Sequence, residues 1–429
     1  MKTTIHWFRR DLRIEDNTAL FHALSQNNNV QCIFIFDENI INELPKNDHR
    51  ISFIYDTLFN INYKLNKYGT SIKIFKGDPV DIFKKIILNN KINSVYFNKD
   101  YEPYTIDRDN TIEKLLSKEN IEVKRYKDHV IFEEKEIVKD DNKPYTIYTP
   151  YSKKWLTKIH ETKITEYNII PFLNNFKKNK NLNIKSREEL DFIKSDTLVY
   201  DFNSTDEIIL NYEKTRNYPF IGGTSKVGPY LRFGLISIRS LVLKSIYKDI
   251  TYLKELIWRD FFSQILFNFP NVINRSFKHK YDNIKWENNE YFLNKWKNGE
   301  TGYPIVDAGM RELNNTGFMH NRVRMITASF LCKHLLIDWR FGEAYFAEKL
   351  FDYELSSNNG NWQWAAGCGC DAAPYFRVFN PYTQQEKFDK EYNYIKKWVP
   401  EYNSNKYVNP LVIHKEARIK AIEHYKKYL

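Results

Sequence analysis

The first part of the chain alternates short apolar runs with amphipathic stretches. Up to about residue 130, runs rich in β-branched and aromatic residues predict strands: TTIHWF, VQCIFIFD, TSIKIFKG, SVYFNKD and IEVKRYKDHVIF. Between them, helical spacing predicts one helix that opens near Ile51 and stops at Gly69, and another with Asp78 as N-cap and Pro79 in its first turn. Strands and helices in strict alternation predict a doubly wound parallel sheet.

The rest of the chain follows other patterns. Residues 131–195 are rich in Lys and Asn, as in KKNKNLNIKSREE, and predict a linker with small helices. Residues 196–429 are mostly helical in pattern, as in YLKELIWRDFFSQILF, and predict an all-α bundle. Because 429 residues exceed what one hydrophobic core usually serves, we expect an α/β domain over 1–130, the linker, and a helical domain over 196–429.

Composition narrows the class of protein. The 30 Tyr, 30 Phe and 9 Trp exceed what core filling needs, so we expect a planar ligand on which rings can stack. A net charge of +11 favours a polyanion such as nucleic acid over a merely basic surface.

The cysteine content and the length of the apolar runs indicate in which cellular compartment the protein is expected. Cys32, Cys332, Cys368 and Cys370 are too few and scattered for a disulfide framework or a zinc site, so we expect no metal and a reducing compartment. The start of the chain lacks an apolar signal core, and no run approaches the roughly 20 apolar residues of a membrane span. We therefore expect a cytoplasmic protein that does not contact membrane.

The segment YELSSNNGNWQWAAGCGCDAAPYFRVFNP, from Tyr353 to Pro381, combines aromatic rings, carboxamides and glycines with few charges. These residue types can build a pocket for a flat molecule with polar edges, such as a flavin or a base. Trp362 and Trp364 are two residues apart, which on a helix separates their rings by about 200°. One ring can face a cofactor and the other a substrate, although packing of both in the core is the alternative.

Two glycine-containing motifs could bind a nucleotide phosphate, and they differ in how strongly they support such a site. The run GGTSKVG, residues 222–228, precedes a helical pattern and offers backbone N–H groups, two hydroxyls and one ammonium. It suits a pyrophosphate, and a capped helix start with turn glycines is the alternative. Gly367, Gly369 and Ala372 have the spacing of a dinucleotide fingerprint, but they follow a helical turn instead of a strand, so we interpret them as coincidence.

A polar stripe marks one predicted helix. Asn321, Arg324 and Met325 share one face of an otherwise apolar pattern. Asp352 or Glu354 could pair with Arg324 in a buried site, and a solvated helix face is the alternative.

Glu255, Trp258 and Arg259 occupy one turn of another predicted helix. A carboxylate can accept a base N–H while a Trp stacks on the base, as a pocket for an extruded base requires. The alternative is a surface ion pair between Glu255 and Arg259 at i, i+4.

Taken together, these segments resemble the photolyase and cryptochrome family. The matching segments are WFRRDLRIEDNTAL, GTSKVGPYLRFG, ELIWRDFF, GYPIVDAGMRELNNTGFMHNRVRMITASFL and the stretch from DYELSSNNGNWQWAAG to FNP. The resemblance is strongest to class I photolyases, which act on cyclobutane pyrimidine dimers. It implies an amino-terminal α/β antenna domain, a linker and a helical domain that binds FAD and DNA.

The resemblance also implies roles for individual residues. The FAD-binding positions are Tyr212, Thr224, Ser225, Lys226, Val227, Gly228, Arg259, Arg324, Asp352, Glu354 and Asn358. The positions that contact the lesion or DNA are Arg216, Glu255, Trp258, Asn321, Arg322, Met325 and Trp364. The catalytic positions are Glu255 and an electron-transfer chain of Trp362, Trp339 and Trp286, ordered from the flavin outward.

The activity that the resemblance implies is light-driven repair of pyrimidine dimers in DNA. The dimer is extruded, excited reduced FAD donates an electron, the cyclobutane ring splits and the electron returns. Six-four photolyases carry His at the positions of Asn321 and Met325, and DASH-type cryptochromes tend to carry Gln at the latter, so neither branch is favoured. A blue-light photoreceptor is the alternative, although we expect little room for a signalling tail after FNP. We expect a monomer whose partner is dimer-containing DNA.

In the phosphate-binding motif, Gly228 stands where many relatives carry Ser, so one hydroxyl contact is lost while the backbone N–H remains.

Any antenna chromophore stays open. For the antenna, Tyr104 and Thr105 stand where folate-binding relatives carry Asn and Glu. A folate is therefore disfavoured, while a deazaflavin, a second flavin or no antenna remain alternatives.

Overall fold

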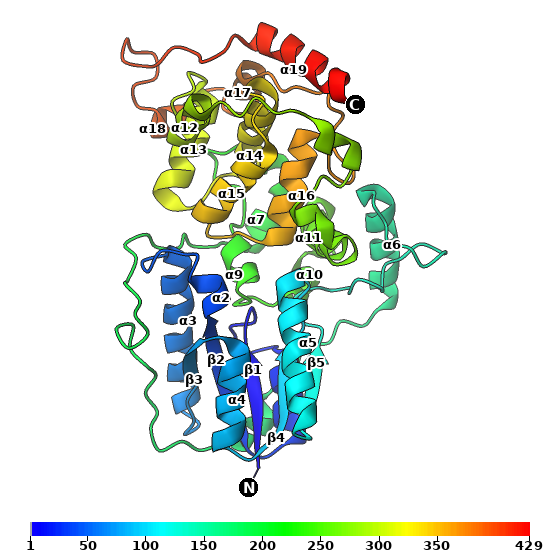
Figure 1. The fold of residues 1–429 in the computed structure, drawn as a ribbon, viewed down its shortest axis with the longest axis vertical. Helices are drawn as coiled ribbons and strands as arrows, with labels where there is room; N and C mark the ends of the chain where they lie inside the picture. The colour runs from blue at the N-terminus through cyan, green and yellow to red at the C-terminus, as the bar shows by residue number, and fades with distance from the viewer. Residues whose placement is uncertain (1) are drawn as a thin grey trace. The chain divides into compact units, whose positions relative to one another are not determined.

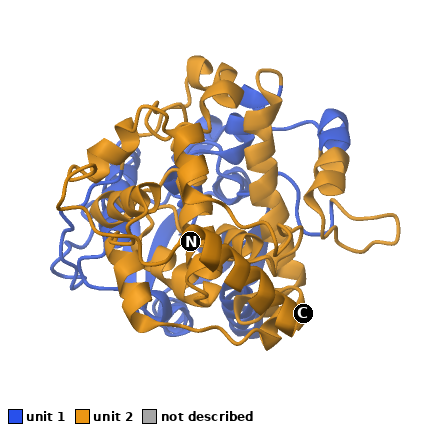
Figure 2. Cartoon of the chain, turned by 90° about the horizontal axis from the view of Figure 1, so that it is seen from above, with its two compact units in different colours: residues 1–136, 156–199, 228–246 blue, residues 137–155, 200–227, 247–429 orange. Residues whose placement is uncertain are grey.

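The computed structural model describes residues 2–429, whose contacts group into two units (Figure 2). The first unit comprises the chain up to Glu136, Leu156–Val199 and Gly228–Ile246. The second comprises Ile137–Trp155, Tyr200–Val227 and Tyr247–Leu429. Each unit is thus assembled from separate segments of the chain.

Five parallel strands form the sheet of the first unit (Figure 1). They are β1 (Thr3–Phe8), β2 (Val30–Asp37), β3 (Lys73–Gly77), β4 (Ile92–Asn98) and β5 (Glu122–Tyr126). Their order is β3-β2-β1-β4-β5, so the winding direction reverses between β1 and β4. This confirms the doubly wound sheet predicted from the alternating pattern.

Two pairs of helices cover the two faces of the sheet. Residues of α1 (Thr18–Gln26) and α3 (His49–Asn66) form one apolar cluster with Phe34 and Phe36 of β2. On the other face, α4 (Pro79–Asn89) and α5 (Pro103–Lys118) share a cluster with the intervening strand residues Ile33 and Ile35. The alternation along β2 is what a strand buried on both faces requires.

The predicted helix ends are confirmed in this unit. The Asp78 side chain accepts hydrogen bonds from the N–H groups of Val80 and Asp81, and Pro79 begins α4. Beyond the end of α3, Gly69 has a φ of +66°, a left-handed conformation that favours glycine. The Asp78 carboxylate therefore fixes where α4 begins.

One buried carboxylate connects three segments of the first unit. Asp128 is fully buried and accepts hydrogen bonds from Nη2 of Arg13 at 2.8 Å and Nη2 of Arg239 at 2.9 Å. Burial alone raises a carboxyl pKa, but the two guanidinium groups outweigh it and hold the pKa of Asp128 well below its usual range. Because Arg239 lies in α10 (Ile238–Ser245), the carboxylate attaches this helix to the strand unit.

We expect Asp128→Ala to destabilise the protein by about 3–5 kcal/mol, because it leaves two buried guanidinium groups without their shared carboxylate. The measurement is urea denaturation followed by circular dichroism. Glu15→Ala is the matched control, since Glu15 pairs with Lys64 at an exposed position and should cost less than about 1 kcal/mol. Equal losses in the two variants would contradict this role of Asp128.

The second unit is helical, which confirms the predicted bundle. Its helices are α7 (Asp206–Leu210), α8 (Tyr212–Thr215), α11 (Ile250–Asn268), α12 (Glu290–Asn298), α13 (Pro304–Thr316), α14 (Asn321–Ser329), α15 (Trp339–Lys349), α16 (Leu355–Ala366), α17 (Pro381–Phe388), α18 (Asn393–Trp398) and α19 (His414–Tyr428). In addition, α6 (Tyr148–Glu161) begins in this unit and ends in the first, where α9 (Gly228–Arg232) also lies. Among residues 2–429, no helix is long and apolar enough to cross a membrane.

Candidate functional site

Helix α16 approaches two neighbouring helices of the second unit very closely. A Cβ on Gly360 would lie 2.2 Å from Cδ1 of Phe262 in α11. A Cβ on Gly342 of α15 would lie 2.1 Å from Cη2 of Trp362. Only glycine fits at these two contacts, so they set the distances from α16 to α11 and α15.

Two carboxamides of α16 are used inside the protein. Nδ2 of Asn359 and Nε2 of Gln363 both donate to the carbonyl of Val272, at 3.0 and 2.9 Å. The Gln363 Oε1 accepts from the N–H of Phe277 at 2.8 Å. These amides therefore hold the segment after α11 onto α16, a role that the sequence pattern did not reveal.

We expect Gly360→Ala to destabilise the protein by about 1–3 kcal/mol, because the added methyl group must displace the Phe262 ring. Thermal unfolding measures the change. Asn361→Ala is the control, since Asn361 is exposed on the same helix and should change stability by less than about 0.5 kcal/mol. A Gly360→Ala protein as stable as the control would contradict the close contact.

Two ion pairs lie at the amino-terminal end of α16. Nη2 of Arg324 donates to both carboxylate oxygens of Asp352, at 3.1 and 2.9 Å. Nη2 of Arg259 pairs with Glu354 at 3.1 Å. Of the two carboxylates predicted for Arg324, Asp352 is therefore its partner. Arg259 of α11 is thus paired with the N-cap residue of α16, whereas the sequence offered Glu255 as its alternative partner.

Asn358 lies next to these pairs and is oriented by one of its own hydrogen bonds. Its Nδ2 donates to Oε1 of Glu343 at 2.9 Å, and burial raises the pKa of that carboxyl. Within residues 2–429, the Asn358 Oδ1 accepts no hydrogen bond. The amide oxygen is thus available to a ligand while its orientation is fixed.

The segment Thr224–Val227 offers a set of donors. Its four backbone N–H groups make no hydrogen bond within the part of the chain that the structure describes. The Ser225 hydroxyl lies 3.1 Å from that of Tyr252, whose ring meets the ring of Tyr212 edge-on. Free N–H groups, hydroxyls and the Lys226 ammonium suit a pyrophosphate. Gly228 follows as the first residue of α9.

A second group of candidate residues surrounds Glu255. Its carboxylate forms an ion pair with Nη1 of Arg216. Burial raises the pKa of Glu255, although the Arg216 guanidinium acts in the opposite direction. Nearby, Arg322 donates to Oδ1 of Asn217 at 2.6 Å and its Nη1 lies 3.5 Å from the Met325 sulfur. The structure thus brings these predicted residues together, while Asn321 is exposed at the start of α14.

Trp258 has a partner that the sequence analysis missed. Its ring stacks on Tyr148 with centroids 3.5 Å apart and planes 4° apart. The Tyr148 hydroxyl donates to the carbonyl of Lys254 at 2.9 Å. Because Tyr148 lies far away in the sequence, no local pattern could reveal the stack.

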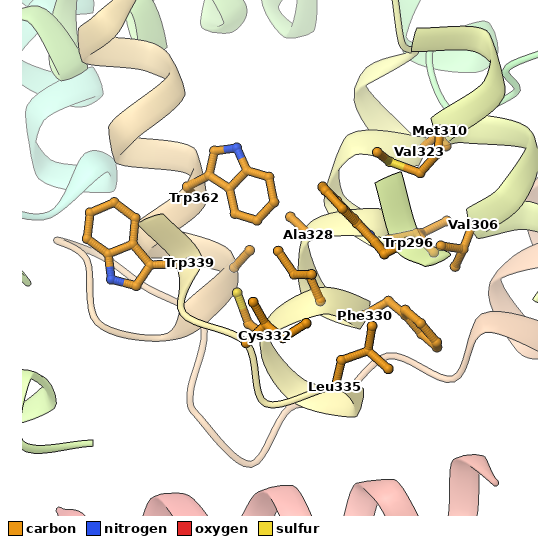
Figure 3. Close-up of a cluster of buried hydrophobic side chains, with 14 of the residues drawn as sticks. Trp296, Val306, Met310, Val323, Ala328, Phe330, Cys332, Leu335, Trp339 and Trp362 are labelled. Atoms are coloured by element: carbon orange, nitrogen blue, oxygen red, sulfur yellow. The ribbon is translucent and has the colours of Figure 1, made fainter. Parts of the chain in front are cut away.

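Four of the candidate tryptophans belong to one hydrophobic cluster: Trp339 and Trp362 lie within it (Figure 3), and Trp286 and Trp364 pack against it. Trp362 and Trp339 are buried, and Trp286 is half-buried with its ring edge-on to Tyr425 at 5.8 Å. Trp364 is only half-buried, as expected for a ring on another side of α16 from Trp362.

His320 is the N-cap residue of α14. Its Nδ1 accepts a hydrogen bond from the N–H of Arg322 at 3.2 Å, which requires a neutral ring with the proton on Nε2. Burial, and then the Arg324 guanidinium, lower the pKa of His320 to about 3.

We expect His320→Asn to reduce the acid sensitivity of the fold. Since the folded pKa of about 3 lies below the unfolded value of about 6.5, this His contributes stability above pH 6.5 that is lost as the pH falls toward 3. Asn keeps an N-cap acceptor but does not titrate. Melting temperatures at neutral and mildly acidic pH should therefore fall less in the variant; equal falls would contradict this prediction.

Comparison with known proteins supplies the class. The family model described as DNA photolyase matches residues 4–168, and the FAD binding domain of DNA photolyase matches residues 252–427. A deoxyribodipyrimidine photo-lyase of Alkalihalophilus pseudofirmus is 36% identical over 424 residues, covering 92% of this chain and 87% of that protein.

Solved structures have the same fold over the whole chain. A class III photolyase from Agrobacterium tumefaciens has a TM-score of 0.85 at 28% identity, covering 100% of this chain and 98% of the other. An archaeal photolyase from Sulfolobus tokodaii with two FAD molecules has a TM-score of 0.84 at 34% identity, covering 99% and 100%. A Synechocystis cryptochrome has a TM-score of 0.82 at 25% identity, covering 100% and 99%.

A parallel α/β unit, a helical unit and these similarities define a flavoprotein of the photolyase type. The chain belongs to the DNA photolyase family, and it carries that family's FAD-binding domain.

Proposed function

We propose that this protein is a light-driven deoxyribodipyrimidine photo-lyase that splits cyclobutane pyrimidine dimers in DNA. The proposal rests on one arrangement in α11. This helix carries both Glu255, which pairs with Arg216, and Trp258, whose ring stacks on Tyr148. A polar group for a base edge and an aromatic plane for a base face are what an extruded dimer needs. The photo-lyase of A. pseudofirmus supports the same reaction class.

The residues of the helical unit fit FAD. The free N–H groups of Thr224–Val227, with the Ser225 hydroxyl and the Lys226 ammonium, would hold the pyrophosphate, and Tyr212 contacts Tyr252 beside Ser225. When bound, FAD would supply the electron that opens the cyclobutane ring under blue light.

Around the isoalloxazine ring of FAD, each polar side chain would have a distinct role. Arg324, fixed by Asp352, would provide positive charge beside the ring edge, and Asn358 would present a neutral amide oxygen. The Arg259–Glu354 pair would hold the amino-terminal end of α16 in place. Positive charge at the ring edge is thus supplied by Arg324, while the Asn358 amide adds a neutral acceptor instead of another carboxylate.

The substrate residues would bind the extruded dimer and its backbone. Trp258 and Trp364 would stack on the bases, Asn321 and Met325 would line the same space, and Arg322 would bind a phosphate. Glu255, with its raised pKa, would bind a base edge and hold a proton there more readily than an ordinary Glu. Trp362, Trp339 and Trp286 would pass electrons toward the cofactor.

Repair is the decisive measurement. The purified protein, with its flavin reduced, is mixed with an oligonucleotide that contains one thymine dimer and illuminated with blue light. Recovery of thymine absorbance in the light and none in the dark is the expected result. A bound flavin that is photoreduced without any repair would instead favour the blue-light photoreceptor, which the similarity to the Synechocystis cryptochrome keeps as the second candidate.

We expect Glu255→Ala to reduce repair by about tenfold or more while FAD binding is retained, since a hydrogen bond that involves a charged group contributes about 1.5–3 kcal/mol. Repair rate and flavin content are measured on the same preparation. Glu213→Ala is the control, because Glu213 is an exposed carboxylate on α8 near Arg216 in sequence. A parallel loss of repair and flavin would count against a substrate role for Glu255.

A further inference from the structure

Two aromatic residues outside the Trp362–Trp339–Trp286 chain lead from Trp362 in another direction. Trp296 of α12 has its ring centroid 6.1 Å from that of Trp362, at an interplanar angle of 73°. Tyr345 of α15 follows, with its centroid 5.9 Å from Trp296. Figure 3 shows Trp296 and Trp362 on two sides of the same core, both pointing into it. These edge-on contacts are within the normal range for neighbouring aromatic rings.

Phe346 fills the space beside this path. Its ring lies 4.9 Å from Trp362 and 6.1 Å from Trp296, nearly parallel to the latter at 13°. Electron tunnelling weakens steeply with the gap between two groups, so rings in continuous contact exchange electrons fastest. The path from Trp362 to Tyr345 is therefore packed throughout.

The path begins in the core and ends near the surface. Trp296 is fully buried, whereas Tyr345 is only half-buried. The Tyr345 hydroxyl donates to Oδ1 of Asn314 at 2.6 Å, and Asn314 is exposed. A phenolic proton at this position can leave to water.

We propose that Trp296 and Tyr345 form a second electron-transfer branch that reduces oxidised Trp362 independently of Trp339 and Trp286. The branch rests on the proposed function, because its oxidant is the light-excited bound flavin that oxidises Trp362. Trp362 takes one electron from Trp296, and Trp296 takes one from Tyr345. Tyr345 then loses its phenolic proton to water and is left as a neutral radical, which a thiol in solution returns to tyrosine by giving up one hydrogen atom.

The surroundings of Trp296 favour a transient positive charge on its indole. Nε1 donates a hydrogen bond to the carbonyl of Thr327 at 3.1 Å, and this oxygen stabilises the oxidised ring. The Nε1 of Trp339 has no hydrogen-bond partner among residues 2–429. Of the two indoles, Trp296 therefore has the better electrostatic support for losing an electron.

The surroundings of Tyr345 favour proton loss together with oxidation. The ammonium groups of Lys297 and Lys349 lie 5.2 and 5.6 Å from the centroid of its ring. Two cations disfavour a positive charge on the ring, so the oxidised tyrosine should release its proton at once. Burial, and then Glu348, raise the pKa of Tyr345 to about 12, so the phenol is protonated beforehand.

The test uses the FAD-bound protein carrying Trp339→Phe, in which the first chain is interrupted, grown with ring-deuterated tyrosine. After blue illumination, electron paramagnetic resonance should detect a tyrosyl radical whose spectrum is narrower than that of the unlabelled protein. Adding Tyr345→Phe should abolish this signal. Adding Tyr291→Phe is the matched control and should leave it unchanged, since Tyr291 is a surface tyrosine with Lys295 over its ring.

The possible outcomes distinguish a failure of the electron-transfer branch from a failure of the proposed repair function. If the Trp339→Phe protein yields no tyrosyl radical while the unaltered protein is photoreduced, the branch is overturned and the proposed function stands. A tyrosyl signal that survives Tyr345→Phe would also overturn the branch, because another tyrosine is then the donor. If the unaltered protein binds FAD and gives no radical in the light, Trp362 is not oxidised and the branch is overturned, whereas the proposed function is decided separately by the repair assay on the reduced protein.

Discussion

The close approach of α16 to α11 and α15 is the constraint on which the helical unit depends. Two positions without a Cβ, Gly360 and Gly342, allow the aromatic rings of Phe262 and Trp362 to lie directly against helix backbone. Every candidate group on α16 inherits its position from these contacts. Asn358 and Trp362 are therefore placed by packing, and their polar neighbours only refine the orientation.

Two sets of ion pairs join residues that are far apart in the chain. Asp128 holds Arg13 and Arg239, and Arg324 holds Asp352, in each case across separate elements. The Asp128 pairs are buried and the Arg324–Asp352 pair is half-buried. Buried pairs add little net stability, yet losing one partner is costly. Such pairs favour the one arrangement of chain segments in which both partners meet, because any other arrangement leaves a charge without its partner.

The sequence was sufficient where the physical cause is local. The strands follow from apolar runs, and the start of α4 from Asp78 and Pro79, because a cap and its helix are neighbours in the chain. The pairing of Arg324 with a carboxylate near residue 352 was predicted because both lie beside recognisable motifs. The stack of Tyr148 on Trp258 was not predictable, since its two members come from segments with no shared pattern. For the same reason, the pairing of Glu255 with Arg216 could not be predicted; the local pattern offered only Arg259 as the alternative partner.

The interleaved segments of the two units have a consequence for the order in which the chain can fold. The α/β unit includes Gly228–Ile246, which the ribosome makes only after Tyr200–Val227 of the helical unit. A nascent chain that ends at Val199 already contains Asp128 and Arg13 but still lacks Arg239. The buried ion pairs of the α/β unit therefore cannot all form until part of the helical unit has been synthesised. The two units thus complete their folding together instead of one after the other.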